Sequence, residues 1–370
     1  MTRASKGAVA PGYEPVRRAL DVFLEEDPAF SAQLCVYVRG ECVIDLAGGP
    51  HLDHTAITGV FSSTKGAAAL TLAMLLESGD LALDEVVSTY WPEFAAGGKV
   101  GVTVRQLLSH QAGLPGLEAG TTPRLVVDQK TGARLLAAQE PQWHPGSMFG
   151  YHALTVGIVM EELVRRITGS TLQALYESRI RSPRSIDFYL GLPDTQDVRY
   201  RDVLPAEGGP VEQAPRDSLR DLAFGHEDLC AFATNEVGIR RCGPAAVGGT
   251  GSARGVGELY AAALGYLGCE FVGRDTLAEM SRLQSAGHDV VLDQEMAFGI
   301  VFMKPQPRVP FGSYRAFGHD GAGGALAFAD PLHDLAFGYI PAPMTLPGGA
   351  DARAVKLSQI ARSCIRPGAR

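Results

Sequence analysis

Apolar side chains recur at helical spacing near both ends of the chain. Residues 13–26 (YEPVRRALDVFLEE) and 352–365 (ARAVKLSQIARSCI) show this spacing, which predicts a helix in each segment. Between residues 32 and 49, segments rich in Val, Ile and Tyr flank the turn Arg39-Gly40-Glu41, and this pattern predicts two paired strands with imperfect alternation. Residues 314–340 are typical of further strands.

The clearest helix is predicted in the segment VFSSTKGAAALTLAMLLESG. It begins at Ser62 or Ser63, is rich in Ala and Leu, and ends near Gly79. Residues 251–267 predict another helix, and the apolar run 298–303 (FGIVFM) predicts a strand.

The middle of the chain differs from both ends. From about residue 85 to about residue 240 no strand series is evident, and helical stretches such as 104–110 and 153–169 alternate with loops rich in Pro and Gly. We therefore expect a sheet domain built from both ends of the chain, with a mainly helical domain inserted between them. Residues 1–85 and 245–370 would form this discontinuous sheet domain, and residues 86–244 an inserted, mainly helical domain. A cleft between two such domains is a common place for a functional site.

Composition restricts the class of function. The 370 residues are 46% hydrophobic, and the net charge of −8 is spread over mixed acidic and basic residues, which argues against a nucleic-acid partner. No uncharged apolar run reaches roughly 18 residues, and the first residues lack a signal-peptide pattern, so we expect a cytoplasmic protein without membrane contact. The cysteines are scattered without metal spacing, which predicts buried, reduced thiols, no metal and no cofactor: Cys35, Cys42, Cys230, Cys242, Cys269 and Cys364.

Lysine is rare in this chain, since only six of the 33 basic residues are Lys. One of them, Lys65, lies in the apolar helix three residues after Ser62, so that both side chains share one helix face. A buried lysine can lose its proton, which an arginine cannot do, and a neutral amine could then accept the hydroxyl proton of Ser62. A single Ser-x-x-Lys also occurs by chance. The non-catalytic alternative is a serine that caps the helix, followed by a solvated lysine.

Four further segments accompany the Ser-x-x-Lys. They are 75–94 (LLESGDLALDEVVSTYWPEF), 102–116 (VTVRQLLSHQAGLPG), 145–169 (PGSMFGYHALTVGIVMEELVRRITG) and 317–331 (FGHDGAGGALAFADP). In this order and at these distances they resemble the serine β-lactamase and penicillin-binding-protein superfamily, in its class C and family VIII carboxylesterase branch. The resemblance spans nearly the whole chain and implies an α+β fold of the β-lactamase/transpeptidase-like type, with an antiparallel sheet flanked by the terminal helices and an inserted, mainly helical domain.

The resemblance also implies roles for individual residues. Ser62 is the acylated nucleophile, Lys65 its activating amine, and Tyr151 the family tyrosine that relays protons as phenol or phenolate. The oxyanion hole is implied at the backbone N–H groups of Ser62 and Ala322, where two fixed donors would stabilise a tetrahedral oxyanion.

Two positions depart from the class C pattern. Tyr151-His152-Ala153 stands where those enzymes carry Tyr-x-Asn, and His319 stands where they carry the Lys of Lys-Thr-Gly. An amide and a fixed positive charge are therefore missing, since a neutral His carries no charge. Both changes favour a neutral ester over a β-lactam.

Several other residues are candidates for substrate contact. His152 could face the cleft or the solvent, and Trp143 either walls the acyl pocket or packs within the helical domain. His110 is expected to be structural, while His51 and His54 lack a third ligand for a metal. The predicted substrate-binding set is His319, Gly321, His152 and Trp143.

Together these features predict a serine carboxylesterase that acts through an acyl-enzyme on Ser62. The alternative is an acyltransferase or transamidase with the same acyl-enzyme, whose acceptor is an amine or an alcohol. A β-lactamase or D-amino peptidase is disfavoured by Ala153 and His319, and a non-catalytic binding protein by the presence of all three catalytic residues. The expected partner is a small-molecule ester or other acyl donor.

Overall fold

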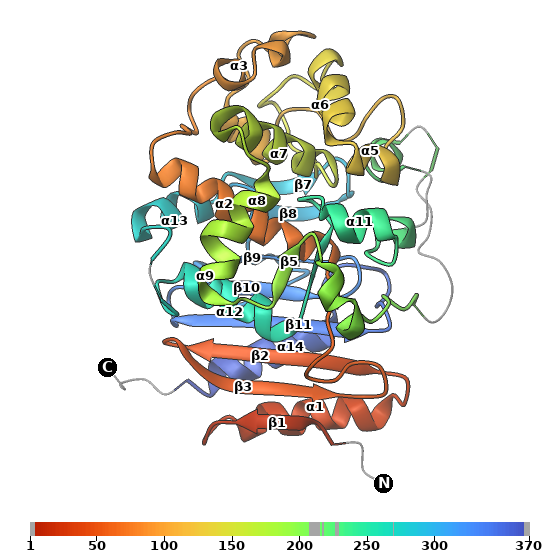
Figure 1. Cartoon of the computed structure of the whole chain (residues 1–370), viewed down its shortest axis with the longest axis vertical. Coiled ribbons are helices and arrows are strands. Elements are labelled where there is room, and N and C mark those ends of the chain that lie inside the picture. Colours follow the sequence, from red (N-terminus) through yellow and green to blue (C-terminus); the bar gives the residue numbers. More distant parts are fainter. Residues whose placement is uncertain (1–3, 207–214, 217, 226–228, 269, 366–370) are drawn as a thin grey trace.

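The largest sheet is formed by segments from both ends of the chain (Figure 1). The computed structural model describes residues 4–206, 215–216, 218–225, 229–268 and 270–365. Within them, six strands follow the order β1-β3-β2-β11-β10-β9, and all neighbours are antiparallel. These strands are β1 (Lys6–Val9), β2 (Ser31–Val38), β3 (Glu41–Gly48), β9 (Phe317–Asp320), β10 (Leu326–Asp330) and β11 (Leu335–Ala342). The predicted hairpin and the predicted C-terminal strands are confirmed.

Helices cover both faces of this sheet. α1 (Glu14–Glu26) and α14 (Ala352–Ser363) contact each other on one face, and α12 (Ala253–Ala263) packs on the other, against β2, β10 and β11. Along β2, Leu34 and Val36 join the cluster with α1 and α14, whereas Cys35 and Tyr37 join the cluster with α12. Every β2 residue is buried, which explains why the hydrophobic alternation in its sequence is weak. The predicted α+β fold with terminal helices on the sheet is confirmed.

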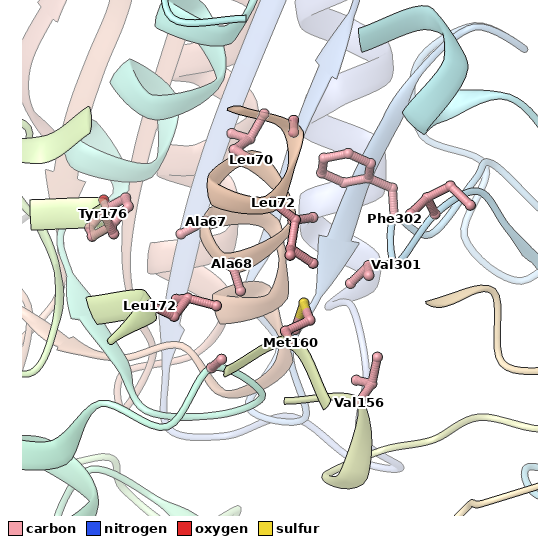
Figure 2. Close-up of a cluster of buried hydrophobic side chains, with 14 of the residues drawn as sticks. Ala67, Ala68, Leu70, Leu72, Val156, Met160, Leu172, Tyr176, Val301 and Phe302 are labelled. Carbon is pink, nitrogen blue, oxygen red and sulfur yellow. The ribbon is translucent and has the colours of Figure 1, made fainter. Parts of the chain in front are cut away.

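The helix α2 (Thr64–Glu77) lies in the interior of the protein. Figure 2 shows side chains packed around it, with Leu172 and Tyr176 on one side and Val301 and Phe302 on another. Because its surface is apolar on nearly all sides, a polar side chain on this helix is surrounded by core. Lys65, in its first turn, is such a residue and is 0% exposed.

The remaining helices and two small sheets lie mostly between these sheet segments in the sequence. The helices are α3 (Val87–Tyr90), α4 (Val104–Leu108), α5 (Pro123–Val127), α6 (Gln129–Ala138), α7 (Thr155–Thr168), α8 (Leu172–Tyr176), α9 (Ser182–Arg184), α10 (Leu219–Phe224), α11 (Val237–Cys242) and α13 (Arg274–Ser281). The small sheets are β4 (Thr58–Gly59), β6 (Gly249–Gly251) and β5 (Phe188–Leu190) in that order, and the hairpin of β7 (Ser285–Asp289) and β8 (Gln294–Phe298). In Figure 1, α3, α5, α6 and α7 lie at the end of the molecule opposite β1.

Three sequence expectations need correction. The middle segment contains a strand, β5, which pairs with β6. The apolar run 298–303 is mostly a turn, in which the Gly299 N–H donates to Phe302 O at 2.8 Å. The prediction of a strand was wrong because a short buried run has no hydrophobic period that distinguishes a strand from a turn. Among the described cysteines only Cys35 is buried, while Cys42 and Cys242 are exposed; Cys269 lies outside the described residues.

Candidate active site

Ser62 lies on a single 3₁₀ turn, η1 (Phe61–Ser63), that leads into α2. Phe61 has a φ of 47°, a left-handed conformation that costs a non-glycine residue about 1–3 kcal/mol. Neighbouring contacts hold this turn: the Thr64 hydroxyl donates to Phe61 O, the Gly249 N–H donates to Thr64 Oγ1 at 2.8 Å, and the Val60 N–H donates to Gly249 O at 3.1 Å. The turn preceding the serine is therefore held in place by β6.

The structure brings the three predicted catalytic side chains together. Lys65 Nζ and Tyr151 OH each lie 3.0 Å from Ser62 Oγ, at hydrogen-bond distance. Lys65 Nζ also donates to Ala246 O at 3.0 Å. Lys65 is 0% exposed and Tyr151 6%, while Ser62 is only partly buried. Ser62 therefore remains accessible while both of its polar partners are shielded from water.

Burial shifts the pKa values of Lys65 and Tyr151 in opposite directions. It lowers the pKa of Lys65 to about 7, although the carboxylate of Asp320 acts in the opposite direction. Burial raises the pKa of Tyr151 above its usual range, and the hydrogen bond with Ser62 offsets only part of this. Near neutral pH a large fraction of Lys65 is therefore a neutral amine, and Tyr151 is a neutral phenol. The arrangement provides a base and a proton carrier on the same serine oxygen.

Asp289 positions the backbone of Tyr151, and sequence reasoning missed it. Its Oδ1 accepts the N–H of Tyr151 at 3.1 Å and the N–H groups of Val291 and Leu292, both at 2.9 Å. Asp289 is 0% exposed, and burial raises its pKa. The other strand of the same hairpin contributes Phe298, whose ring stacks on Tyr151 with centroids 5.7 Å apart. In the sequence, Asp289 is an acidic residue directly before the apolar residues 290–292, and this pattern gives no indication that it contacts Tyr151.

His319 lies beside Tyr151 at the end of β9. Its Nε2 is 3.5 Å from Tyr151 OH, and its Nδ1 is 2.8 Å from Asp320 O. Burial lowers the pKa of His319, so the ring is neutral at pH 7. Burial acts to raise the pKa of Asp320, but the contacts with His319 and Arg308 hold it at about 2. The nearby cation of Arg308 is paired with Asp320 at 3.1 Å. This agrees with the inference from the sequence that the site lacks a fixed, unpaired positive charge, because His319 stands where class C enzymes carry a Lys.

The structure places His152 and Trp143 in the protein interior. His152 is 1% exposed, so it does not face the solvent, and both ring nitrogens have backbone partners. Nε2 accepts the Leu114 N–H at 3.0 Å and Nδ1 lies 2.6 Å from Gly150 O. Trp143 is 7% exposed and donates through Nε1 to Gln111 O at 3.3 Å, so it packs among the residues of the middle segment. A direct polar contact of either ring with substrate would require these bonds to break.

Gly321 and Ala322 follow β9 and lie against the nucleophile turn. A Cβ at Gly321 would be 2.2 Å from Val60 O, so only glycine permits this approach. Ser63 Oγ donates to His319 O at 3.2 Å, which ties the same strand to the turn. Ala322 packs against a small apolar cluster that contains Phe61. These contacts place the two predicted oxyanion-hole residues on adjoining segments.

Across the described ranges, no three His, Cys, Asp or Glu side chains gather as a metal site would require. None of the helices in those ranges combines the length and the apolar character that a bilayer span needs.

An antiparallel sheet flanked by helices, with Lys65 and Tyr151 both within hydrogen-bond distance of Ser62, defines a serine enzyme of the β-lactamase/transpeptidase fold. The sequence profile of the beta-lactamase family matches residues 16–359, and the chain belongs to this family.

Among solved structures, the chain is 45% identical to EstA from Arthrobacter nitroguajacolicus Rue61a, with a TM-score of 0.92 over 97% of this chain and 98% of that one. It is 31% identical to a family VIII carboxylesterase, with a TM-score of 0.90 over 97% and 99% of the two chains. Among curated proteins, it is 28% identical over 361 residues to the esterase/beta-lactamase LipL of Mycobacterium tuberculosis, covering 90% of this chain and 82% of LipL. The resemblance drawn from the sequence motifs is confirmed.

Proposed function

We propose that the protein is a carboxylesterase that forms an acyl-enzyme on Ser62. The observation that supports this is the convergence of Lys65 Nζ and Tyr151 OH on Ser62 Oγ, each at 3.0 Å. The esterase names of its relatives agree with this chemistry.

The proposed reaction begins with transfer of the Ser62 proton to the neutral amine of Lys65. Ser62 Oγ then attacks the ester carbonyl, and the backbone N–H groups of Ser62 and Ala322 stabilise the oxyanion. The phenol of Tyr151 donates a proton to the departing alkoxide, and Lys65 returns the proton to the phenolate. Water follows the same path in reverse to release the acid and restore Ser62.

The preferred substrate is an ester without a charged acyl group. His319 is neutral and the nearby guanidinium of Arg308 is paired with Asp320, so a substrate carboxylate would find no unpaired cation among these three groups. This arrangement disfavours a β-lactam, which carries a carboxylate.

A second candidate function keeps the acyl-enzyme and replaces water by an amine or an alcohol. It shares the contacts of Ser62 described above, so only the fate of the acyl group separates a hydrolase from an acyltransferase or transamidase.

The cytoplasmic location of the protein stays a prediction. So does its division into a sheet domain of residues 1–85 with 245–370 and a helical domain of residues 86–244.

Intact-protein mass spectrometry after brief exposure to p-nitrophenyl butyrate tests the proposal. We expect a butyryl adduct to form on Ser62 and to decay in water. The adduct should be absent in Ser62→Ala, and it should still form and decay in the matched control Ser63→Ala. An adduct that decays only after addition of amines or alcohols would support the acyltransferase instead. Unchanged acylation of Ser62→Ala would exclude Ser62 as the nucleophile.

A further inference from the structure

Two cysteines lie next to each other on strands β2 and β3. Cys35 Sγ is 3.7 Å from Cys42 Sγ. In the register of these antiparallel strands, Cys35 is opposite Asp45 and Cys42 is opposite Tyr37, with an irregularity after Val36. Cys35, Tyr37 and Cys42 therefore share the face of the sheet that packs against α12, and the irregular register brings the two sulfurs together diagonally.

The two thiols differ in accessibility. Cys35 is 0% exposed, whereas Cys42 is exposed. An oxidant in solution can reach Cys42 directly, and Cys35 is held behind it within the sheet. The sulfurs need to approach by only about 1.7 Å to reach the bonded S–S distance of about 2.0 Å.

The surroundings also differentiate the reactivity of the pair. The hydrogen bond with Cys35 lowers the pKa of Cys42, and the guanidinium of Arg254 acts in the same direction, while burial and Asp45 oppose them. The pKa of Cys35 is raised well above its usual range by the same hydrogen bond and by burial. Because the thiolate is the reactive form, oxidation begins at Cys42.

We propose that Cys35 and Cys42 form an oxidisable dithiol pair that hydrogen peroxide converts into a disulfide between β2 and β3. The Cys42 thiolate attacks one peroxide oxygen, which breaks the O–O bond and leaves a sulfenic acid, while the released hydroxide takes up the proton that the Cys42 thiol had lost and becomes water. The sulfur of Cys35 then attacks the sulfenic sulfur, so that the S–S bond forms, the S–O bond breaks and the oxygen leaves as water. In total two thiols are oxidised, one peroxide is reduced and two waters are produced.

This site is independent of the proposed esterase chemistry. β2 and β9 are separated by β11 and β10, so the strands lie about three spacings, or roughly 14 Å, apart across the sheet. The disulfide would join strands that are already paired. We therefore expect the oxidised enzyme to keep its hydrolytic activity.

Peptide mapping offers a direct test, because trypsin places the cysteines in different peptides. Cys35 lies in residues 19–39 and Cys42 in residues 40–65. The protein is treated with hydrogen peroxide, free thiols are alkylated, and the digest is analysed with and without a reductant. We expect the two peptides to be joined after oxidation and separated by the reductant. Cys242, also exposed, lies in residues 242–254 and serves as the internal control.

Variants separate the two steps. In Cys35→Ser, Cys42 should be trapped as a sulfenic acid by dimedone, and no joined peptide should form. In Cys42→Ser, Cys35 should remain reduced. Direct overoxidation of Cys42 to the sulfinic acid without a joined peptide in the wild-type protein would overturn the proposal, as would joining of Cys42 to Cys242 at equal yield.

Discussion

The protonation state of Lys65 predicts how activity depends on pH. With a pKa of about 7, the amine is neutral in about 90% of molecules at pH 8, about 50% at pH 7 and about 10% at pH 6. If the neutral amine accepts the proton of Ser62, kcat/KM should fall about tenfold between pH 8 and pH 6. A solvated lysine, which titrates at about 10.4, would remain almost fully protonated across this range and would give no such midpoint.

The assay is hydrolysis of p-nitrophenyl butyrate from pH 5.5 to pH 9 at constant ionic strength, followed at the isosbestic wavelength of p-nitrophenol. The ester does not titrate in this range, so the acidic limb of kcat/KM reports the free enzyme. A kcat/KM that does not fall toward the acidic end of this range would refute the role of Lys65 as the base.

Asp320→Asn provides an independent check on the same limb. The carboxylate of Asp320 stabilises protonated Lys65, and its loss also leaves the cation of Arg308 without its partner. Both effects lower the pKa of Lys65, so the midpoint should move to lower pH. A shift to higher pH would mean that another group controls the limb.

Three further predictions concern Lys65, Asp289 and His319. Lys65→Met should abolish turnover yet raise the free energy of unfolding at pH 7 by about 1–2 kcal/mol, because the cost of burying an amine is removed. The wild-type free energy of unfolding should rise by about 1.4 kcal/mol per pH unit between pH 7 and pH 10, where only the unfolded state protonates Lys65, so the gain of the variant should disappear between about pH 8 and pH 9 and reverse by pH 10. Asp289→Ala should lower kcat about 10- to 100-fold with a smaller change in KM, because the Tyr151 N–H loses its acceptor, whereas Asp289→Asn keeps an acceptor oxygen and should retain most activity. His319→Lys should improve KM for esters that carry a carboxylate, since it adds a charge near Ser62.

Urea unfolding at several pH values measures the first of these effects, and equal pH slopes for wild type and Lys65→Met would contradict it. For Asp289, equal losses of kcat in the Ala and Asn variants would show that the acceptor oxygen is not what matters. For His319, paired neutral and carboxylate-bearing esters serve as mutual controls, and an unchanged KM ratio would indicate that this side chain does not reach the substrate.

The sequence predicts a large part of the fold because its signals are local. The spacing of apolar residues is sufficient for α1, for the hairpin of β2 and β3, and for α7, since each element follows from neighbours a few residues apart. The same signal fails at residues 298–303, where a short buried turn has no period of its own.

The catalytic candidates could be predicted from motifs, but their chemical state could not. Ser62 and Lys65 are one turn apart, so their proximity follows from local geometry. The lowered pKa of Lys65 depends on core side chains that enclose α2 from several parts of the chain. The N–H of Tyr151 and the carboxylate of Asp289 are 138 residues apart in the sequence, and no local pattern links them.

Whether a feature follows from the sequence or only from the tertiary structure depends on how far apart in the sequence the interacting residues are. Backbone periodicity, helix starts and turn preferences depend on adjacent residues, and the sequence alone therefore determines most of the long elements and their order. The candidate nucleophile follows from the order of the motifs and the family that they resemble. Burial and contacts between distant segments arise only when those elements pack together. Tertiary structure therefore decided that Lys65 is shielded from water, that His152 faces inward, and that Cys35 lies 3.7 Å from Cys42.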